Sequence, residues 1–305
     1  MVRTRRGRLL LVVRVRRKVS LPPPPPHPPP SSPPATPFSD PLDAEPVIAG
    51  AGDIAAAGGG AETTAKLLDG IDPDVVYTTG DNAYPDGAAG DYASFYEPTW
   101  GRHKAKTRPT PGNHDYGQPG AGPYFDYFGP LAGERGNGYY AYSLGSWRLY
   151  ALNSNIPMGA GSPQETWLRL DLAANRPACA LAYWHHPRFS AGVYADDVRS
   201  DGVWRALYDA GAEVVLTGHD HNYQRYAPMR PDGAVDPSRG IREFVVGTGG
   251  NGHYPLVPRL DGSREAGDDQ THGVLMLTLS RYGYGWRFIP IRGLTFTDRG
   301  FGFCH

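Results

Sequence analysis

The sequence predicts an α/β or α+β fold, because its first part alternates strand and helix patterns whereas its last part shows strand patterns alone. From Pro46 onward, short apolar runs are separated by helical patterns, which is typical of parallel sheets built from βαβ units. After residue 240 the strand patterns have no helices between them, which favours antiparallel or mixed additions to the sheet. Hydrophobic residues make up 40% of the chain and charged residues 20%, as in ordinary soluble globular proteins.

Two of the expected elements carry clear local signals. The helix expected over 163–174 begins after Ser162, a suitable N-cap, and Glu165 follows three residues later. Gly145 and Ser146 separate two strand patterns and so predict a hairpin. The expected strands cover residues 47–52, 74–79, 107–111, 139–144, 147–153, 179–184, 213–217, 242–247, 273–279 and 284–291, and the expected helices cover residues 61–68, 91–103, 163–174 and 202–210.

The chain ahead of these elements differs in composition from the rest. Residues 1–39 contain eight basic groups and no acidic one, which leaves 22 basic and 31 acidic residues in 40–305. An acidic folded body is a poor partner for nucleic acid, so no nucleic-acid binding is expected. Eleven prolines between residues 22 and 37 exclude helix and paired strand there. We therefore expect a basic segment over 1–21, a proline-rich linker over 22–40, with a proline-motif ligand as the alternative, and one folded domain over 41–305.

The cellular location is addressed by two weak features of the sequence. The apolar patch Leu9–Val13 follows a basic start but is shorter than the roughly 7–15 residues of an export signal. Either it is a degenerate signal, which would make the protein secreted or part of the cell envelope, or the natural start lies elsewhere. Cys179 and Cys304 could form one bridge or remain two independent thiols. No apolar run reaches the roughly 18 residues that a transmembrane helix needs.

Short polar clusters follow five of the expected strands. Ligands of open α/β sheets bind at the carboxyl ends of strands, so these clusters could converge on one site. Their side chains offer oxygen and nitrogen donors without a thiolate, which suits iron, zinc or manganese. Two such ions about 3.5–4 Å apart can clamp a phosphoryl group. The clusters are Asp53; Asp81, Asn82 and Tyr84; Asn113, His114 and Asp115; His185 and His186; and His219 and His221.

In order and spacing, these motifs resemble the signature of the calcineurin-like metallophosphoesterase family, over about residues 46–250. The resemblance implies a four-layer sandwich of two mixed sheets flanked by helices, with residues 41–305 as the catalytic domain. The matching motifs are Gly52-Asp53, Gly80-Asp81, Gly112-Asn113-His114-Asp115, His185 and Gly218-His219-Asp220-His221.

Within that family, the purple acid phosphatases are the most similar subgroup. Most members of the family place a metal-binding His or Gln two residues after the first Asp, where this chain has Ala55. Purple acid phosphatases instead use a Tyr from Gly-Asp-x-x-Tyr, and Tyr84 occupies that position here. The segment 219–225 also resembles their His-x-His-x-Tyr-x-Arg motif.

The resemblance implies a pair of metal ions bridged by Asp81 and a phosphatase that hydrolyses phosphate monoesters by means of a metal-bound hydroxide. A phenolate ligand favours a trivalent ion, by resemblance Fe(III), and the second ion would be divalent iron, zinc or manganese. The first ion would be held by Asp53, Asp81, Tyr84 and His221, and the second by Asp81, Asn113, His185 and His219.

The catalytic residues implied by the resemblance are His114 and Asp115. His114 would stabilise the transition state or act as a general acid, and Asp115 would orient its ring. Relatives often supply another His after the His-x-Pro motif, but no His lies between Pro187 and Gly218. Tyr194, His186 and His253 remain alternative substrate contacts and proton donors.

Two other functions remain open on the sequence. The first is a phosphodiesterase acting on nucleotides or lipids with the same metal ions. The second is a non-catalytic phosphate- or metal-binding protein. If the protein is a phosphatase, we expect its binding partner to be a small-molecule phosphoester substrate.

Overall fold

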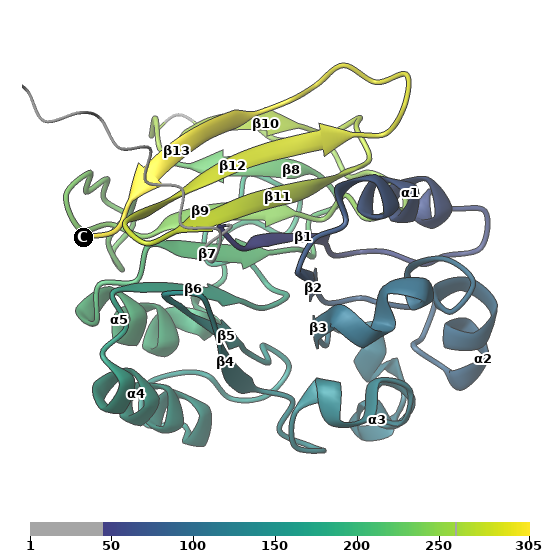
Figure 1. Ribbon diagram of the computed structural model, residues 1–305, viewed down its shortest axis with the longest axis horizontal. Helices are drawn as coiled ribbons and strands as arrows, with labels where there is room; N and C mark the ends of the chain where they lie inside the picture. Colours follow the sequence, from purple (N-terminus) through teal and green to yellow (C-terminus); the bar gives the residue numbers. More distant parts are fainter. Residues whose placement is uncertain (1–44, 260) are drawn as a thin grey trace, which may run out of the picture. The chain divides into compact units, whose positions relative to one another are not determined.

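The computed structural model describes residues 45–259 and 261–305 (Figure 1). The basic segment 1–21, the proline-rich linker 22–40 and the start of the expected domain lie outside these residues. No helix in the described part is long and apolar enough to cross a membrane.

The described residues form thirteen strands in two sheets, and both sheets are mixed, as predicted. The six-stranded sheet has the order β13-β12-β11-β1-β2-β3, with β1, β2 and β3 parallel to one another. The seven-stranded sheet has the order β10-β8-β9-β7-β6-β5-β4, with β5, β6, β7 and β9 parallel. The strands are β1 Val47–Ala51, β2 Val75–Thr79, β3 Thr107–Thr110, β4 Tyr140–Leu144, β5 Trp147–Ala151, β6 Cys179–Tyr183, β7 Val214–Thr217, β8 Tyr223–Tyr226, β9 Arg242–Val246, β10 Arg264–Asp268, β11 Gly273–Ser280, β12 Gly283–Pro290 and β13 Arg299–Phe303.

Helices flank the sheets and complete the predicted sandwich. Helix α1 packs against β1 and β11, and α4 and α5 lie side by side next to the seven-stranded sheet (Figure 1). The α-helices are α1 Ala61–Ile71, α2 Ala89–Asp91, α3 Gly122–Phe128, α4 Pro163–Asn175 and α5 Asp201–Asp209, and the principal π- and 3₁₀-helices are η1 Tyr92–Tyr96 and η2 Trp100–Lys106.

The alternation of side chains along the central strands builds two cores. Successive residues of a strand point to opposite faces, so Leu149 and Leu181 join the core between the sheets. Their neighbours Tyr150 and Ala182 join a second core beneath α4 and α5. All five residues of β6 are buried, as expected of a strand that is covered on both faces.

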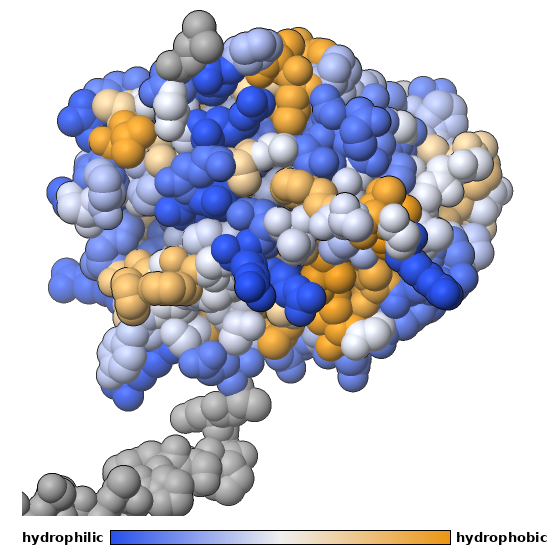
Figure 2. All heavy atoms as spheres, turned by 90° about the horizontal axis from the view of Figure 1, so that it is seen from above, coloured by the Kyte–Doolittle hydropathy of each residue, from blue (hydrophilic) through white to orange (hydrophobic). Residues whose placement is uncertain are grey.

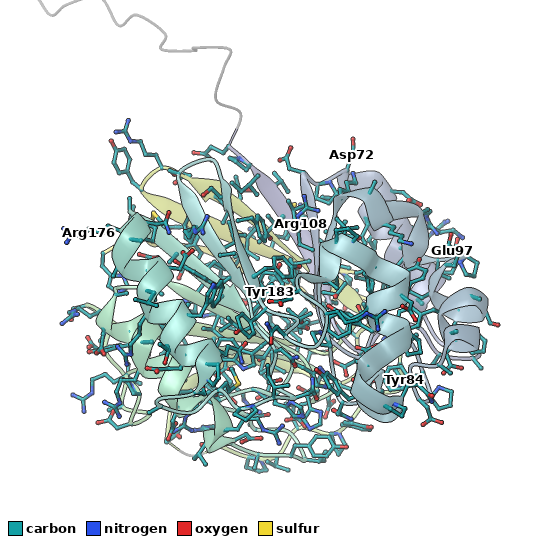
Figure 3. All side chains as sticks on the ribbon, turned by 90° about the horizontal axis from the view of Figure 1, so that it is seen from below. Asp72, Tyr84, Glu97, Arg108, Arg176 and Tyr183 are labelled. Atoms are coloured by element: carbon teal, nitrogen blue, oxygen red, sulfur yellow. A yellow bond between two sulfur atoms is a disulfide. The ribbon has the colours of Figure 1, made fainter. Side chains whose placement is uncertain are left out.

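Side-chain hydrogen bonds also connect the two sheets. The Tyr183 hydroxyl, in the interior in Figure 3, donates to the carbonyl oxygen of Arg108 at 3.1 Å. The indole N–H of Trp147 donates to the carbonyl oxygen of Ser280 at 2.7 Å. Cys179 of β6 and Cys304, just beyond β13, form a disulfide, which decides between the two alternatives left open by the sequence.

Most of residues 91–103 are helical, as expected, but they do not form one continuous α-helix. The chain instead forms α2, one π-helical segment over 92–96 and a 3₁₀-helix over 100–106. Pro98 separates the last two segments, and proline cannot donate the backbone hydrogen bond of a continuous helix. Strands β8, β10 and β13 and helix α3 were not expected.

The surface has no single dominant apolar area on the face shown in Figure 2, where hydrophobic side chains form separate patches among hydrophilic ones. Exposed aromatic side chains do occur near the β12–β13 edge, where Tyr282, Phe301 and Phe303 are each about 70% exposed.

Candidate metal centre

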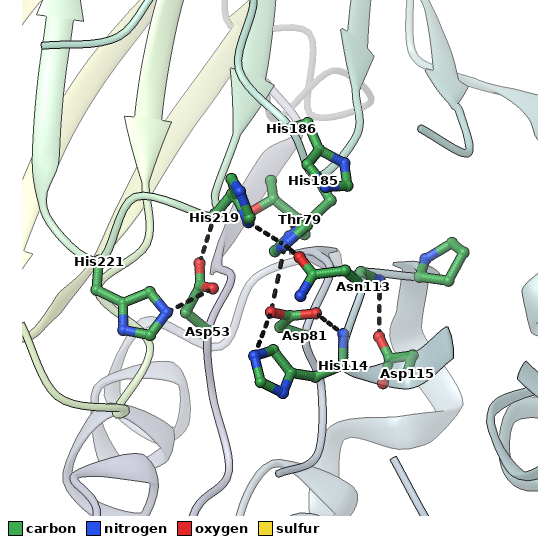
Figure 4. Close-up of polar contacts among 12 residues, drawn as sticks. Asp53, Thr79, Asp81, Asn113, His114, Asp115, His185, His186, His219 and His221 are labelled. Carbon is green, nitrogen blue, oxygen red and sulfur yellow. Dashed lines mark hydrogen bonds and ion pairs between the residues drawn. The ribbon is translucent and has the colours of Figure 1, made fainter. Parts of the chain in front are cut away.

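The polar clusters predicted from the sequence meet at one edge of the two sheets (Figure 4). Asp53, Asp81, His185 and His219 each stand two residues beyond the end of a strand, and Asn113 stands three beyond. Strands β1, β2 and β3 belong to one sheet and β6 and β7 to the other, so both sheets contribute to the site.

Three of these residues adopt a backbone conformation that is usually found at glycine. The φ angles are 59° at Asp53, 51° at Asp81 and 67° at His219, all in the left-handed region. Non-glycine residues adopt this region at a cost of order 1–3 kcal/mol, and such residues cluster at functional sites. The strain therefore points to a function for this edge that does not depend on the motif comparison.

Close packing explains two glycines of the motifs. A Cβ atom at Gly112 would lie 2.0 Å from Oδ1 of Asp81, and one at Gly218 would lie 2.7 Å from Oδ2 of Asp53. Any larger residue at these positions would push the carboxylates out of place.

The first group of donors surrounds the phenol of Tyr84. Its Oη lies 3.0 Å from Oδ1 of Asp53, 3.1 Å from Oδ2 of Asp81 and 3.2 Å from Nε2 of His221. Nδ1 of His221 lies 2.5 Å from the carbonyl oxygen of Gly252 and therefore donates to it. In the neutral ring this leaves the lone pair of Nε2 directed at the centre.

The second group surrounds the buried imidazole of His185. Its Nε2 lies 3.0 Å from Oδ1 of Asn113, 3.1 Å from Nδ1 of His219 and 3.3 Å from Oδ2 of Asp81. Its Nδ1 donates to the carbonyl oxygen of Thr79 at 2.8 Å, so the neutral ring again directs a lone pair inward. Oδ2 of Asp81 is common to both groups.

The chemistry of these donors fits bound cations. When His185 and His221 are neutral, lone pairs of carboxylate, amide and imidazole face one another at about hydrogen-bond distance, an arrangement that a bound cation stabilises. Despite the opposing effect of burial, the carboxylate of Asp81 raises the pKa of His185 to about 9. Burial and the carboxylates of Asp53 and Asp81 raise the pKa of Tyr84 well above its usual value, so its phenolate requires a cation nearby.

Two sets of three residues bring their ligand atoms close enough together to bind one metal ion. Asp53, Asp81 and His185 bring ligand atoms within 4.8 Å of one another. His185, His186 and His219 do the same. Both sets draw on the predicted cluster, with His186 as an additional candidate.

His114 lies at the edge of the same group. Its backbone N–H donates to Oδ1 of Asp81 at 2.7 Å, and its Nε2 lies 3.9 Å from Oδ2 of that residue. Nδ1 lies 2.5 Å from the carbonyl oxygen of Pro85, and the ring packs on Tyr84 with centroids 4.4 Å apart. The ring is thus held with Nε2 on the side of the centre.

The expected contact between Asp115 and the ring of His114 is not formed, because the carbonyl oxygen of Pro85 takes that place. The carboxylate of Asp115 accepts hydrogen bonds from the backbone N–H of Gly112 at 2.8 Å and from the side-chain amide of Asn82 at 2.9 Å. The hydroxyl of Tyr92 donates to it at 2.6 Å. Asp115 therefore joins the loops after β2 and β3 rather than orienting His114.

The three expected substrate contacts occupy different surroundings. His186 is buried, and its Nδ1 lies 2.8 Å from the hydroxyl of Ser154. Tyr194 is 52% exposed and stacks on His219 at 4.0 Å. His253 stacks on His272 and reaches the carbonyl oxygen of His221 at 3.2 Å, so it lies behind a ligand candidate.

Comparison with known proteins decides the family. The sequence profile of the calcineurin-like phosphoesterases matches residues 46–223, more than half of the chain. The chain belongs to the calcineurin-like phosphoesterase family. This confirms the resemblance seen in the motifs.

Purple acid phosphatases are among the similar sequences. Purple acid phosphatase 21 of Arabidopsis thaliana is 28% identical over 242 residues, which cover 70% of this chain and 52% of that protein. Purple acid phosphatase 15 of the same plant is 28% identical over 129 residues, 40% of this chain and 24% of that protein. The chain thus spans about half or less of the length of these relatives.

Solved structures share the calcineurin-like phosphoesterase fold. The purple acid phosphatase PPD1 from yellow lupin seeds aligns with a TM-score of 0.69 at 19% identity, over 83% of this chain and 53% of that one. GAP50, the anchor in the inner membrane complex of Plasmodium, aligns with a TM-score of 0.64 at 14% identity, over 84% of this chain and 88% of that one. At these identities the likeness concerns the fold alone.

Two residues that contact this candidate site are not predicted by the sequence motifs. Tyr92 holds Asp115 from the π-helical segment, and Tyr254 stacks on His221 with centroids 3.9 Å apart. Neither residue belongs to a motif at the end of a strand. Tyr254 follows the glycine-rich segment 247–252, but that pattern alone does not indicate which ring it meets.

Proposed function

We propose that this protein is a hydrolase that cleaves phosphate monoesters at a pair of metal ions. The observation that carries the proposal is the position of Oδ2 of Asp81, which lies within 3.3 Å of both Tyr84 Oη and His185 Nε2. One carboxylate oxygen between two groups of donors is what a bridging ligand requires. The 28% identity to purple acid phosphatases supports the same activity.

The ligand atoms around Tyr84 and those around His185 suit different metal ions. Tyr84, with Asp53, Asp81 and His221, would hold Fe(III), because a phenolate is a hard anionic donor. Asn113, His185 and His219, with Asp81, would hold divalent iron, zinc or manganese. When bound, such ions polarise the phosphate and make water a stronger nucleophile at neutral pH.

His114 is the proposed stabiliser of charge on the phosphoryl group. The Pro85 carbonyl fixes its Nδ1–H, so a protonated ring keeps Nε2–H free to donate to a phosphate oxygen at the centre. Asp115 is a positioning residue. Its carboxylate binds both Gly112, in the loop that carries His114, and Asn82, in the loop after β2.

Tyr194 is the best placed of the three candidates for protonating the leaving group. It is exposed beside His219, whereas His253 lies behind His221. Burial and the neighbouring His185 and His219 lower the pKa of His186 far below its usual value, so its ring stays neutral. A neutral ring is a weak acid.

Substitution of Asp81 tests the proposal. Metal content, the visible spectrum and phosphate release from a monoester and a diester should be measured on wild type and on Asp81→Asn. Wild type should contain about two ions per chain, show tyrosinate–iron absorption and prefer the monoester. The variant should lose both ions and all turnover. Asp209→Asn, an exposed position on α5, is the matched control.

Other results would support the rival functions. Faster diester cleavage would support the phosphodiesterase. Metal binding without turnover of either ester would support the non-catalytic protein. Full metal loading of Asp81→Asn would exclude the bridging role.

An exported or cell-envelope location is part of the proposal. The disulfide between Cys179 and Cys304 supports it, because disulfides persist in oxidising compartments and are rare in reducing ones.

A further inference from the structure

Two tyrosines at the metal centre each stack on one histidine of the ligand set. The ring of Tyr194 lies 4.0 Å from that of His219 with 27° between the planes. The ring of Tyr254 lies 3.9 Å from that of His221 with 12° between the planes. The two tyrosine rings are 5.8 Å apart and meet at 69°, so they form two walls of a corner. Each ring packs on a proposed ligand of a different ion.

The backbone holds this tyrosine corner in place. The N–H of Tyr194 donates to Oδ1 of Asp220 at 3.3 Å, and the N–H of Tyr254 donates to the carbonyl oxygen of His221 at 3.1 Å. Val257 N–H donates to the carbonyl oxygen of Ala191 at 2.8 Å and so ties the two tyrosine-bearing segments together. The backbone of both tyrosine-bearing segments is therefore held in place before any ligand arrives, which reduces the entropy lost on binding.

Close packing adds to this restraint. A Cβ atom at Gly192 would lie 2.1 Å from the carboxylate carbon of Asp220, so only glycine lets the Tyr194 segment approach this closely. The same carboxylate accepts a hydrogen bond from the hydroxyl of Ser190. Asp220 is the middle residue of the His-x-His motif, so the position of Tyr194 is linked to the ligand segment itself.

The corner lies beside the centre and is open to solvent. Tyr194 is 52% exposed although one face of its ring rests on His219. Tyr254 is partly buried, and its ring rests on that of His221. Nε2 of His221 lies 3.2 Å from Oδ1 of Asp53, so the ring of Tyr254 packs on a residue of the centre.

We propose that Tyr194 and Tyr254 bind an aromatic ring on the alcohol side of the phosphate monoester, so that the preferred substrates have aromatic leaving groups. A planar ring can stack on one wall and meet the other edge to face, the two arrangements that aromatic pairs prefer. An aliphatic group of the same size can fill the corner but cannot stack. The inference rests on the proposed function, because it names the substrate class of the same site.

Non-hydrolysable phosphonates test the inference without turnover. Calorimetry on the metal-loaded full chain should compare benzylphosphonate with cyclohexylmethylphosphonate, which is similar in size but not planar, and with methylphosphonate. We expect benzylphosphonate to bind about tenfold more tightly than methylphosphonate, with the cyclohexyl compound between them. Tyr254→Leu should bring the benzyl-to-methyl ratio of Kd values close to one. Tyr254→Phe keeps the ring and should keep the ratio.

Two outcomes would overturn this inference. One is equal affinity of the wild type for the benzyl and cyclohexylmethyl compounds, and the other is an unchanged ratio in both Tyr254→Leu and Tyr194→Leu. In the latter case the tyrosines only support the histidines. Phosphate release from benzyl phosphate is measured separately, so retained benzyl selectivity without turnover would overturn the proposed function and leave the aromatic site standing.

Discussion

Among single residues, Asp53, Asp81 and His219 show how the chain keeps the proposed ligands in a strained backbone conformation. Each has a positive φ angle, and each is fixed by bonds between segments that are distant in the sequence. The N–H of Asp53 donates to the carbonyl oxygen of Gly80 at 3.0 Å, and the N–H of His219 donates to Oδ2 of Asp53 at 2.9 Å. Such bonds to a buried carboxylate contribute about 1.5–3 kcal/mol, enough to offset the strain at one residue.

Replacement of His114 by Ala separates catalysis from metal binding. Only the side chain is lost, and the backbone N–H that donates to Asp81 remains. We expect metal content to be unchanged and kcat for a monoester to fall about 10²-fold or more, because the proposed donor to the phosphate is removed. Metal analysis and initial rates check this. A variant that loses metal would show that His114 has a structural role, and unchanged turnover would remove it from the mechanism.

The donor atoms of the site could be predicted from the sequence, but their surroundings could not. Asp81 and His185 each stand two residues beyond the end of a strand, so a strand pattern and the polar residues that follow it are enough to predict them. The partner of the His114 ring is a backbone carbonyl 29 positions away, and backbone atoms carry no residue-specific signal. Tyr254 was missed for a similar reason, since its ring meets His221 only through the path of a loop.

Among the elements, helix α4 offers the clearest test of a local signal. The hydroxyl of Ser162 accepts a hydrogen bond from the N–H of Glu165 at 3.2 Å, as the sequence predicts. Ser162→Ala should lower the free energy of unfolding by about 1 kcal/mol, because a helical N–H loses its acceptor. Urea denaturation measures the change. Ser162→Asn keeps an acceptor and should be nearly neutral, and equal losses in both variants would argue against capping.

The strands show which elements a sequence pattern can miss. β6 and β11 are rich in apolar residues and were expected, whereas β13 has the sequence Arg-Gly-Phe-Gly-Phe. Glycine weakens a strand pattern, yet a Cβ atom at Gly300 would lie 2.4 Å from the ring of Trp286, and one at Gly302 would lie 2.5 Å from that of Tyr284. The aromatic rings on β12 leave room only for glycine at these positions. A pattern read within β13 alone does not show which residues of β12 lie opposite.

For the whole molecule, the disulfide is the main covalent constraint. It joins Cys179 in one sheet to Cys304 beside the edge of the other, across 125 positions. Reduction should lower the free energy of unfolding by about 2–5 kcal/mol, because a cross-link over a long loop restricts the unfolded chain. Urea denaturation with and without a thiol measures this. Cys304→Ser should already be destabilised and should not respond to the thiol; an equal response of both proteins would exclude the bridge as the cause.

A buried carboxyl group should also make the stability of the whole molecule depend on pH. Glu213 lies between the sheet and the C-terminal residues, where its carboxylate accepts a hydrogen bond from the N–H of Ala180 at 2.6 Å. Burial raises the pKa of Glu213 from 4.5 to about 7, so between these values the folded chain holds a proton that the unfolded chain has released. Its contribution is complete below pH 4.5 and is lost as the pH rises through about 7.

Glu213→Gln should therefore reduce the dependence of the free energy of unfolding on pH between 4.5 and about 7. An amide keeps an acceptor for the Ala180 N–H but has no proton to lose, so the decline between pH 4.5 and 7 should shrink by up to about 3 kcal/mol. A decline towards higher pH should remain, because burial also raises the pKa of Glu243 to about 8. Urea denaturation at a series of pH values, at constant metal concentration, measures both. Glu45 is exposed, so Glu45→Gln is the control and should show the same pH dependence as the wild type. If the stability of Glu213→Gln falls as steeply with pH as that of the wild type, Glu213 is already ionised in the folded protein.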